Sequence, residues 1–216
     1  YPRHEAADAA KILQSYGVKH AQIELNQLVI PGFCENGAQR CYYCKYALFS
    51  EIKAEAAKHG ITAVADGANT DDENDYRPGM RATAELGILS PLRSAGFSKL
   101  DIRESSKELG IFTWNKPSYA CLASRIPYGE EITAEKLAMV ERAEQALLDM
   151  GFKEMRVRCH GKLARIEVAE NDFAKAAAQR KEISAAVKNA GFLYAALDLE
   201  GFRSGSLNAA LENKNA

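Results

Sequence analysis

Apolar residues recur at helical spacing over much of the first 127 residues, and short apolar runs lie between these segments. The pattern predicts helices over residues 3–16, 41–59, 80–86 and 98–109. Short strands are expected over residues 21–26, 62–66 and 88–90. Helices that alternate with strands predict a parallel α/β sheet, in which ligands bind at the carboxyl ends of the strands.

The pattern changes after the turn Pro127-Tyr-Gly129. Two long helices are predicted over residues 133–150 and 172–191. Three strands are predicted over residues 153–159, 163–169 and 192–199. This order indicates a small antiparallel sheet covered by two helices, an α+β arrangement. We therefore expect two domains, over residues 1–127 and 128–216.

Composition excludes several classes of protein. The 216 residues include 28 lysines and arginines against 29 aspartates and glutamates, for a net charge of −1. A chain without a basic field is a poor candidate for non-specific binding of nucleic acid. Apolar runs are shorter than the roughly 20 residues that span a bilayer, and no signal peptide is visible. With five cysteines and no secretory signal, we expect free thiols in a cytoplasmic protein that does not bind membranes.

Three cysteines are the candidate chemical centre. Cys41 and Cys44 are three residues apart at the start of a predicted helix, where the helix dipole favours thiolates. Cys121 lies in a polar, positively charged loop between Lys116 and Arg125. Thiolates bind zinc or iron–sulfur clusters, and three of them leave the fourth corner of a cubane cluster open for an exogenous sulfide. Alternatively, the first two cysteines are buried small apolar residues.

A structural zinc site with three cysteines would need a fourth ligand such as histidine. None of the four histidines lies near these cysteines in the sequence, since they are residues 4, 20, 59 and 160. Cys34 and Cys159 are interpreted as structural. For Cys159 the reason is its alternation onto an apolar face with Met155 and Val157.

A polar loop rich in carboxylates follows the strand predicted over residues 62–66. The residues that could hold Mg²⁺ on a nucleotide phosphate, or bind ribose hydroxyls, are Asp66, Asn69, Asp71, Asp72 and Asp75. Arg77 and Arg81 would suit contact with phosphate. An ordinary polar loop with solvated arginines has the same composition, so both interpretations stay open. The spacing does not match an EF-hand.

Two arginines alternate along the strand predicted over residues 153–159. Arg156 and Arg158 lie on the face opposite its apolar residues, and Arg165 and Glu167 are expected to share that face from the partner strand. Adjacent guanidinium groups repel each other, so a phosphate or carboxylate between them is the favoured interpretation. The alternative is a solvated sheet face with one salt bridge.

Several motifs extend through nearly the whole chain. They are Arg40-Cys-Tyr-Tyr-Cys-Lys45, Asp66-Gly-Ala-Asn-Thr-Asp-Asp72, Asp75-Tyr-Arg-Pro-Gly79, Ser90-Pro-Leu92, Lys116-Pro-Ser-Tyr-Ala-Cys-Leu-Ala-Ser-Arg125, Arg156-Val-Arg158 and Ala164-Arg-Ile-Glu167. Together they resemble the LarE family, ATP-dependent sulfur transferases that help make the nickel-pincer nucleotide cofactor of lactate racemase. The resemblance implies a Rossmann-like parallel sheet of the ATP pyrophosphatase type, followed by a small α+β domain for substrate binding or oligomerisation.

The resemblance also implies a two-step reaction. ATP with Mg²⁺ activates a carboxylate of a pyridinium-3,5-biscarboxylic acid mononucleotide, which gives an acyl-adenylate and pyrophosphate. Sulfur then displaces AMP to give a thiocarboxylate, and both ring carboxylates react. The implied site residues are Asp66, Asn69, Asp71, Asp72 and Arg81 for the nucleotide and Mg²⁺, and Arg125, Arg156 and Arg158 for the phosphate of the substrate. Family members form trimers or hexamers, which implies a homo-oligomer.

Versions of the family differ in the source of sulfur. In one, a cysteine at the position of Cys121 gives up its own sulfur and becomes dehydroalanine. In the other, three cysteines hold a [4Fe-4S] cluster whose open iron carries a transferable sulfide. Because Cys41 and Cys44 accompany Cys121, the chain resembles the cluster type, with Cys121 as the catalytic cysteine in either version.

One motif of the family, a Ser-Gly-Gly-x-Asp-Ser pyrophosphatase loop after the first strand, does not occur in this sequence. The chain opens on Tyr1 and a helical pattern, so we expect an N-terminus truncated just downstream of that loop, with poor ATP binding and no turnover by these residues alone. Three other functions stay open. They are a related tRNA thiolase, which predicts a basic face, a non-enzymatic zinc module, and an amide-forming ATP pyrophosphatase similar to NAD synthetase.

Overall fold

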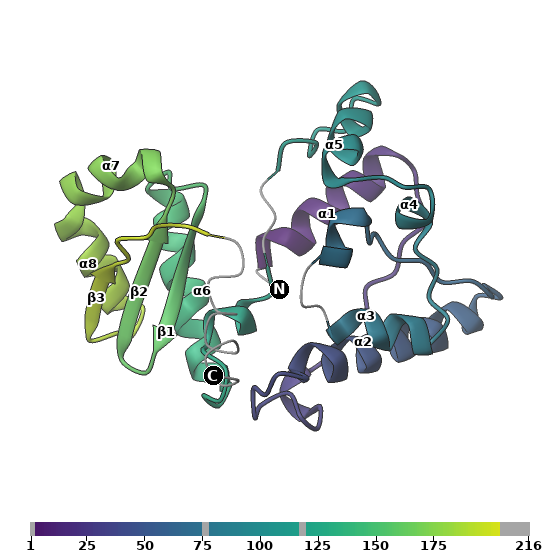
Figure 1. Ribbon diagram of the computed structural model, residues 1–216, viewed down its shortest axis with the longest axis horizontal. Helices are drawn as coiled ribbons and strands as arrows, with labels where there is room; N and C mark the ends of the chain where they lie inside the picture. Colours follow the sequence, from purple (N-terminus) through teal and green to yellow (C-terminus); the bar gives the residue numbers. More distant parts are fainter. Residues whose placement is uncertain (1–2, 75–77, 117–119, 204–216) are drawn as a thin grey trace. The chain divides into compact units, whose positions relative to one another are not determined.

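The computed structural model describes residues 3–74, 78–116 and 120–203 of the chain (Figure 1). The chain divides into two compact units. The helical unit is Gln22–Ser118, and the sheet unit combines Tyr1–Ala21 with Tyr119–Ala216. Helices and strands are both present, which confirms a mixed α/β protein. The expected domains over residues 1–127 and 128–216 stay a prediction.

The helical unit contains three of the predicted helices, α2 (Arg40–Lys58), α3 (Pro78–Glu85) and α5 (Lys99–Glu108). It also contains the short helix α4 (Pro91–Ser94), which was not predicted, and the 3-10 turns η1 (Gln27–Val29) and η2 (Thr70–Asn74). Local signals set their ends. The Ser98 hydroxyl accepts a hydrogen bond from the Asp101 amide and the Asp101 carboxylate accepts one from the Ser98 amide, a capping box that begins α5. Gly60, at φ +70°, takes the left-handed conformation that follows the end of α2.

The strands predicted for this unit are reduced to one contact in its described residues. Ala65 and Leu89 form an isolated parallel bridge, in which the Asp66 amide donates to the Leu89 carbonyl at 2.8 Å. The bridge joins the segments predicted as strands at 62–66 and 88–90, and these segments run parallel, as predicted. The strand predicted over residues 21–26 is wrong, because that segment forms none. A short extended segment without paired neighbours gains too little from its backbone to be stable as a strand.

Close approach of small residues helps the helical unit to pack. A Cβ at Gly32 would lie 2.5 Å from the ring of Tyr43, and a Cβ at Gly79 would lie 2.6 Å from Cδ of Lys45. Both neighbouring side chains project from α2, so the two glycines let the η1 loop and α3 lie directly against that helix. The ammonium group of Lys53 adds a hydrogen bond to the carbonyl of Leu86, which follows α3, at 2.7 Å.

The sheet unit holds three strands in the order β1-β2-β3. Its elements are α1 (Arg3–Ser15), η3 (Leu122–Arg125), α6 (Ala134–Asp149), β1 (Met155–His160), β2 (Leu163–Val168), η4 (Glu170–Asp172), α7 (Phe173–Ala178), α8 (Arg180–Asn189) and β3 (Tyr194–Leu197). Strands β1 and β2 form an antiparallel hairpin, whereas β3 pairs with β2 in parallel. The predicted antiparallel sheet is therefore wrong and the sheet is mixed. A crossover through α7 and α8 returns the chain to the end of the sheet at which β2 begins. Strand β3 therefore runs in the same direction as β2.

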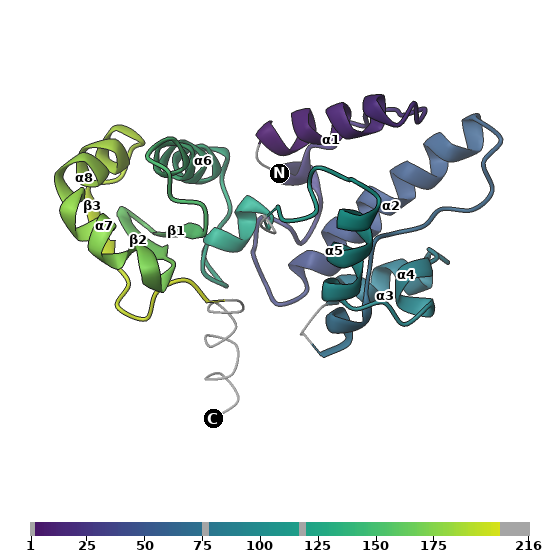
Figure 2. The same cartoon turned by 90° about the horizontal axis from the view of Figure 1, so that it is seen from above.

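Helices α6 and α8 lie side by side on one face of the sheet (Figure 2). Between them and the strands lies an apolar core with almost no solvent exposure. It includes Val140, Ala143, Leu147, Val157, Cys159, Ala164, Val168, Val187 and Phe192. The burial of Cys159 with Met155 and Val157 confirms the predicted alternation of β1. The helix predicted over residues 172–191 is broken at Gln179, which ends α7 and precedes α8.

Within the described part of the chain, every helix is too short or too polar to cross a lipid bilayer.

Candidate functional site

Cys41 and Cys44 lie in the first turns of α2, and both side chains are half-buried. The side-chain amide of Gln27, in η1, donates to the sulfur of Cys44 at 2.9 Å. A guanidinium nitrogen of Arg40 lies 3.6 Å from the sulfur of Cys41 and donates to it. Each sulfur therefore has an N–H donor directed at it. Donors of this kind favour anionic sulfur and tune the potential of iron–sulfur clusters, so the pair fits thiolate ligands.

Arg40 also fixes the loop that leads into this helix. Its side chain is only 5% exposed and donates to the side-chain carbonyl of Asn36, which is fully buried at φ +51°. The Asn36 amide in turn donates to the carbonyl of the buried Phe33. Gln27, Arg40 and Asn36 were not among the predicted site residues. In the sequence, Arg40 is marked only by its position directly before Cys41.

Cys121 immediately precedes η3 in the sheet unit, and its thiol is half-buried. Its carbonyl accepts hydrogen bonds from both the amide and the hydroxyl of Ser124, at 2.9 and 2.7 Å. Leu122 and Ala123 are buried, and η3 contacts α6 and β1. The backbone that carries this thiol is thus attached to the core of the sheet unit.

The three predicted cluster ligands belong to different units, Cys41 and Cys44 to the helical unit and Cys121 to the sheet unit. Within the described residues of each part of the chain, no group of three histidine, cysteine, aspartate or glutamate side chains is arranged to hold a metal ion. The shared cluster of all three cysteines stays a prediction.

Asp66 follows the Ala65–Leu89 bridge, at the carboxyl end of the extended segment where a ligand was expected. Its carboxylate accepts hydrogen bonds from the hydroxyl of Ser90 at 2.8 Å and from the amide of Ala68 at 3.1 Å. These two bonds join the predicted carboxylate loop to the Ser-Pro-Leu motif, which begins α4. The two motifs, 24 residues apart, therefore form one local structure.

The other acidic and amide side chains of this loop also bind backbone amides. Asp72 accepts from the amide of Asn69 at 3.0 Å, and Asn69 accepts from the amide of Asp71 at 3.1 Å. Asp71 accepts from the amide of Lys99, the first residue of α5, at 3.0 Å. These contacts shape the loop. Asp75 and Arg77, also predicted for this site, lie outside the described residues.

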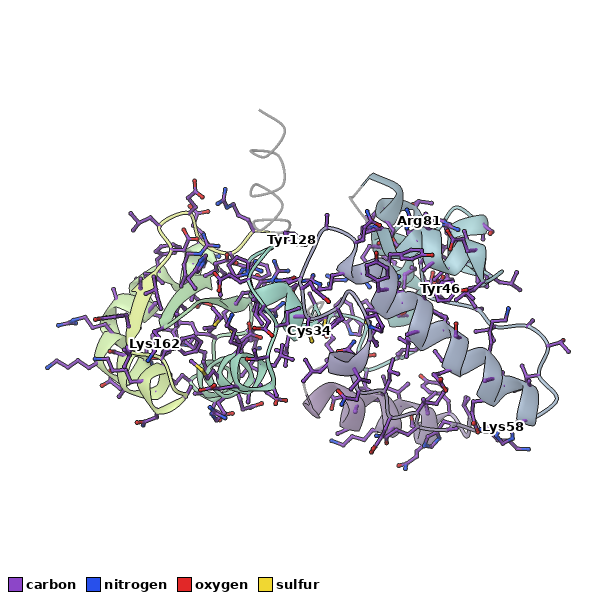
Figure 3. The ribbon with its side chains drawn as sticks, turned by 90° about the horizontal axis from the view of Figure 1, so that it is seen from below. Cys34, Tyr46, Lys58, Arg81, Tyr128 and Lys162 are labelled. Carbon is purple, nitrogen blue, oxygen red and sulfur yellow. The ribbon has the colours of Figure 1, made fainter. Side chains whose placement is uncertain are left out.

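Arg81 on α3 lies in a cluster with two aromatic residues of α2. Its guanidinium group lies 4.0 Å from the centre of the Tyr42 ring and 3.5 Å from the carboxylate of Glu85. The Tyr42 hydroxyl donates to Glu85 at 2.6 Å, and this bond raises the pKa of Tyr42. Tyr46 packs beside Tyr42, with ring centres 5.9 Å apart. Figure 3 labels Tyr46 and Arg81 in the helical unit. Arg81 is more than half exposed, so its outer side can reach an anion.

Two of the predicted phosphate ligands form buried, bidentate ion pairs. Arg125 binds both carboxylate oxygens of Glu144, at 2.7 and 3.1 Å. Arg158 binds both oxygens of Glu167 at 2.9 Å. All four residues are at most 5% exposed. In each pair, the Nε atom and one Nη atom of the guanidinium group bind the two carboxylate oxygens. The carboxylate therefore largely compensates the positive charge of the arginine.

Arg156 differs from these two arginines. Its guanidinium group lies over the ring of Phe202 at 4.6 Å and donates to the carbonyl of Arg203 at 3.0 Å. Burial, together with the charges of Arg158 and Arg125, lowers its pKa to about 10. Within the described part of the sheet unit, its side chain has no carboxylate at ion-pair distance.

The predicted polar face of the hairpin is confirmed by its register, since Arg156 lies opposite Glu167 and Arg158 opposite Arg165. Arg165 pairs with Glu167 and also with Asp198, which lies 3.0 Å away. Among the described residues, the ion pairs around the hairpin and the neighbouring Arg156 form a cluster of four arginines and three carboxylates. They are Arg125, Arg156, Arg158 and Arg165 against Glu144, Glu167 and Asp198. The excess positive charge lies at Arg156 and favours an anionic ligand.

No family model matches the chain. An uncharacterized protein of Synechocystis sp. is 42% identical over 209 residues, which cover 96% of this chain and 78% of that protein. The pyridinium-3,5-bisthiocarboxylic acid mononucleotide synthase of Lactiplantibacillus plantarum is 41% identical over 170 residues, 79% of this chain and 62% of the synthase. An uncharacterized protein of Methanocaldococcus jannaschii is 35% identical over 186 residues, 86% of this chain and 73% of that protein.

Identity at this level over most of the chain shows common ancestry with all three proteins. The relative with an assigned activity is a synthase that makes a thiocarboxylated mononucleotide. The chain belongs to the LarE family, the family that its motifs resemble.

Proposed function

We propose that the protein is an ATP-dependent sulfur transferase of a pyridinium-3,5-biscarboxylic acid mononucleotide. The observation that supports this most strongly is the 41% identity to a synthase whose name specifies the bisthiocarboxylic product. Its helical unit, on this proposal, is part of a Rossmann-like domain of the ATP pyrophosphatase type. The parallel bridge between Ala65 and Leu89 is the contact expected between neighbouring strands of such a sheet.

The proposed chemistry has two steps at each ring carboxylate. A carboxylate oxygen attacks the α-phosphorus of ATP, and pyrophosphate leaves with the electron pair of the broken P–O bond. A sulfur nucleophile then adds to the acyl carbon, and AMP leaves. Adenylation is needed because a carboxylate oxygen is a very poor leaving group, whereas AMP is a good one. The protein contributes by holding both substrates in contact and by stabilising the charges that develop.

The nucleotide and Mg²⁺ are assigned to Asp66, Asn69, Asp71, Asp72 and Arg81. The loop is already organised by hydrogen bonds from backbone amides, and carboxylate oxygens are the ligands that suit a hard cation. Preorganisation of this kind lowers the entropy lost when a metal–phosphate complex binds. The exposed side of Arg81 suits the negative charge of the phosphates.

The phosphate of the mononucleotide is assigned to the arginines of the sheet unit. Arg156 is the group proposed to contact it, because Arg156 lacks a carboxylate partner among the described residues and has a neighbourhood of excess positive charge. Arg125 and Arg158 contribute to the positive potential, although each is compensated by its own glutamate. The resemblance to the family implied that all three arginines bind the phosphate, and the ion pairs of Arg125 and Arg158 favour Arg156 for the direct contact.

The sulfur is proposed to come from a [4Fe-4S] cluster held by Cys41, Cys44 and Cys121. When bound, the cluster would supply a sulfide nucleophile at its open corner. The N–H donors from Gln27 and Arg40 fit this role, since they stabilise negative charge on the sulfurs of the first two ligands. As a member of its family, the protein is further proposed to be a cytoplasmic homo-oligomer.

The sulfur source is tested by anaerobic reconstitution of the protein with iron and sulfide, followed by absorbance in the iron–sulfur charge-transfer region. The wild type should gain the band, and Cys41→Ala, Cys44→Ala and Cys121→Ala should each lose it. Cys34→Ala is the matched control, because Cys34 is a half-buried thiol of the helical unit outside the proposed ligand set. Retention of the band in the Cys41 and Cys44 variants would contradict the cluster. Conversion of Cys121 to dehydroalanine after turnover, seen as loss of H₂S in the protein mass, would instead establish the sacrificial route.

A further inference from the structure

Two buried carboxylates are connected through arginines to the backbone around Cys121. Glu144 on α6 and Glu167 on β2 are 5% and 0% exposed. Neither residue lies near Cys121 in the sequence. Glu167 was expected only on the polar face of the hairpin, and Glu144 was not predicted as part of a site. Their arginine partners, Arg125 and Arg158, both make further hydrogen bonds to the loop that carries the thiol.

The first connection runs from Glu144 through Arg125. While its Nε and one Nη atom bind the carboxylate, the other Nη atom of Arg125 donates to the hydroxyl of Ser124 at 2.9 Å and to the carbonyl of Ala120 at 3.5 Å. Glu144 is itself fixed, because it also accepts a hydrogen bond from the amide of Val157 on the edge strand β1 at 2.9 Å. The carboxylate of Glu144 on α6 therefore binds both strand β1, through the Val157 amide, and the loop that carries Cys121, through Arg125.

The second connection runs from Glu167 through Arg158. The Arg158 atom that does not contact Glu167 donates to the carbonyl of Ser124 at 2.7 Å. Both connections thus end on Ser124, one at its hydroxyl and one at its carbonyl. Ser124 completes the path, since its amide and hydroxyl donate to the carbonyl of Cys121.

We propose that Glu144 and Glu167 are positioning residues for the sulfur of Cys121. The inference rests on the proposed function in so far as Cys121 is the cysteine that handles sulfur. Each carboxylate holds the guanidinium group of one arginine in a single orientation. The two guanidinium groups then hold the loop that carries Cys121 through the hydroxyl and the carbonyl of Ser124. Reactive groups need such support, because displacement by about 1 Å can lower a reaction rate by about two orders of magnitude.

The charges explain why neutral substitution should loosen the loop. A buried arginine that loses its carboxylate is left as an uncompensated charge, and it will move toward water or other acceptors. Glu144→Gln and Glu167→Gln keep the shape of the side chain and remove its charge. Each variant should therefore release its arginine from Ser124 while the apolar core of the sheet unit stays packed.

The test is the rate at which each cysteine of the full-length protein, purified in air without added iron, is alkylated by iodoacetamide, read residue by residue by mass spectrometry. Cys159 is a built-in control, since it is fully buried in the same unit and reacts only when that unit opens. We expect each glutamine variant to raise the rate at Cys121 by about 10- to 100-fold, the effect of losing one charge-assisted hydrogen bond of about 1.5–3 kcal/mol. The rate at Cys159 should stay unchanged.

Glu135→Gln is the matched substitution, because Glu135 is an exposed glutamate of α6. It should leave all rates at their wild-type values. Equal rates at Cys121 in all variants, or parallel increases at Cys121 and Cys159, would overturn the positioning role and leave only a contribution to global stability. The measurement needs no sulfur transfer. A failure of the proposed reaction would therefore be seen in the cysteine-to-alanine series and not here.

Discussion

Substitution of Arg156 by glutamine separates a phosphate ligand from an ordinary surface arginine. Arg156 carries the uncompensated charge of its cluster, next to Arg158 and close to Arg125. Its removal should weaken the binding of a phosphate-bearing ligand. It should not weaken the fold, because the charges that lower the pKa of Arg156 repel it.

The size of the effect follows from the contacts. A hydrogen bond from a charged donor to phosphate contributes about 1.5–3 kcal/mol at a half-buried site. Because about 1.4 kcal/mol corresponds to a tenfold change in affinity, the dissociation constant should rise by about 10- to 100-fold. The hydrogen bond to the Arg203 carbonyl and the contact with the Phe202 ring are lost at the same time. The hydrogen bond is exposed, and relief of the repulsion from Arg158 and Arg125 offsets both losses.

The assay is thermal unfolding with and without a pyridinium mononucleotide, with isothermal titration calorimetry for the affinity. Ligand that binds only the folded state stabilises it by about 2.7 kcal/mol at a concentration of about 100 times its dissociation constant. The wild type should show this shift, and Arg156→Gln should lose most of it while unfolding at the same temperature without ligand. Arg180→Gln, at an exposed arginine of α8, is the control. Equal affinities for wild type, Arg156→Gln and Arg180→Gln would refute the assignment of phosphate to Arg156.

Two further predictions concern the fold around the sites. Gly32→Ala should lower the free energy of unfolding, measured by urea denaturation, more than Gly60→Ala does. The difference should be about 1 kcal/mol or more, because the added methyl group overpacks the site. Both glycines have positive φ, but only at Gly32 would the new Cβ meet a side chain, the ring of Tyr43. Equal costs would contradict the close approach. Burial, together with the charge of Arg165, lowers the pKa of His160 below its ordinary value of 6.5. The imidazole of His160 therefore takes up a proton more readily in the unfolded chain than in the folded protein. The stability conferred by the neutral ring is complete above about pH 6.5 and is lost as the pH falls below that value. Denaturation across pH 5–8 should show a smaller slope for His160→Gln, and identical slopes would contradict it.

The sequence predicts the helices well because their signals are local. The capping box at Ser98 and the glycine after α2 determine helix ends from within a few residues. The alternation along β1 likewise predicts the apolar face with Cys159. The strand expected at residues 21–26 and the direction of β3 fail, because strand formation and direction depend on distant partners and on the crossover between them.

The same distinction applies to the candidate sites. The cysteines, the carboxylate loop and the hairpin arginines are visible as residue types at fixed spacing. The roles of Glu144, Ser124 and Gln27 are not, because each depends on a contact with a different element. Glu144 in particular stands in a helix among many charged residues, and only the packing of α6 against β1 and η3 shows that it is buried and paired.

The most direct measurement is the mass of the mononucleotide after incubation with the full-length protein, ATP, Mg²⁺ and a sulfide source under anaerobic conditions. Each carboxylate should exchange one oxygen for sulfur, in two successive steps, with release of AMP and pyrophosphate. The Cys121→Ala variant should form AMP at most and no thiocarboxylate. A substrate mass unchanged by the wild-type protein would show that the protein transfers no sulfur to this mononucleotide, and thiocarboxylate formed equally well by Cys121→Ala would show that Cys121 does not handle the sulfur.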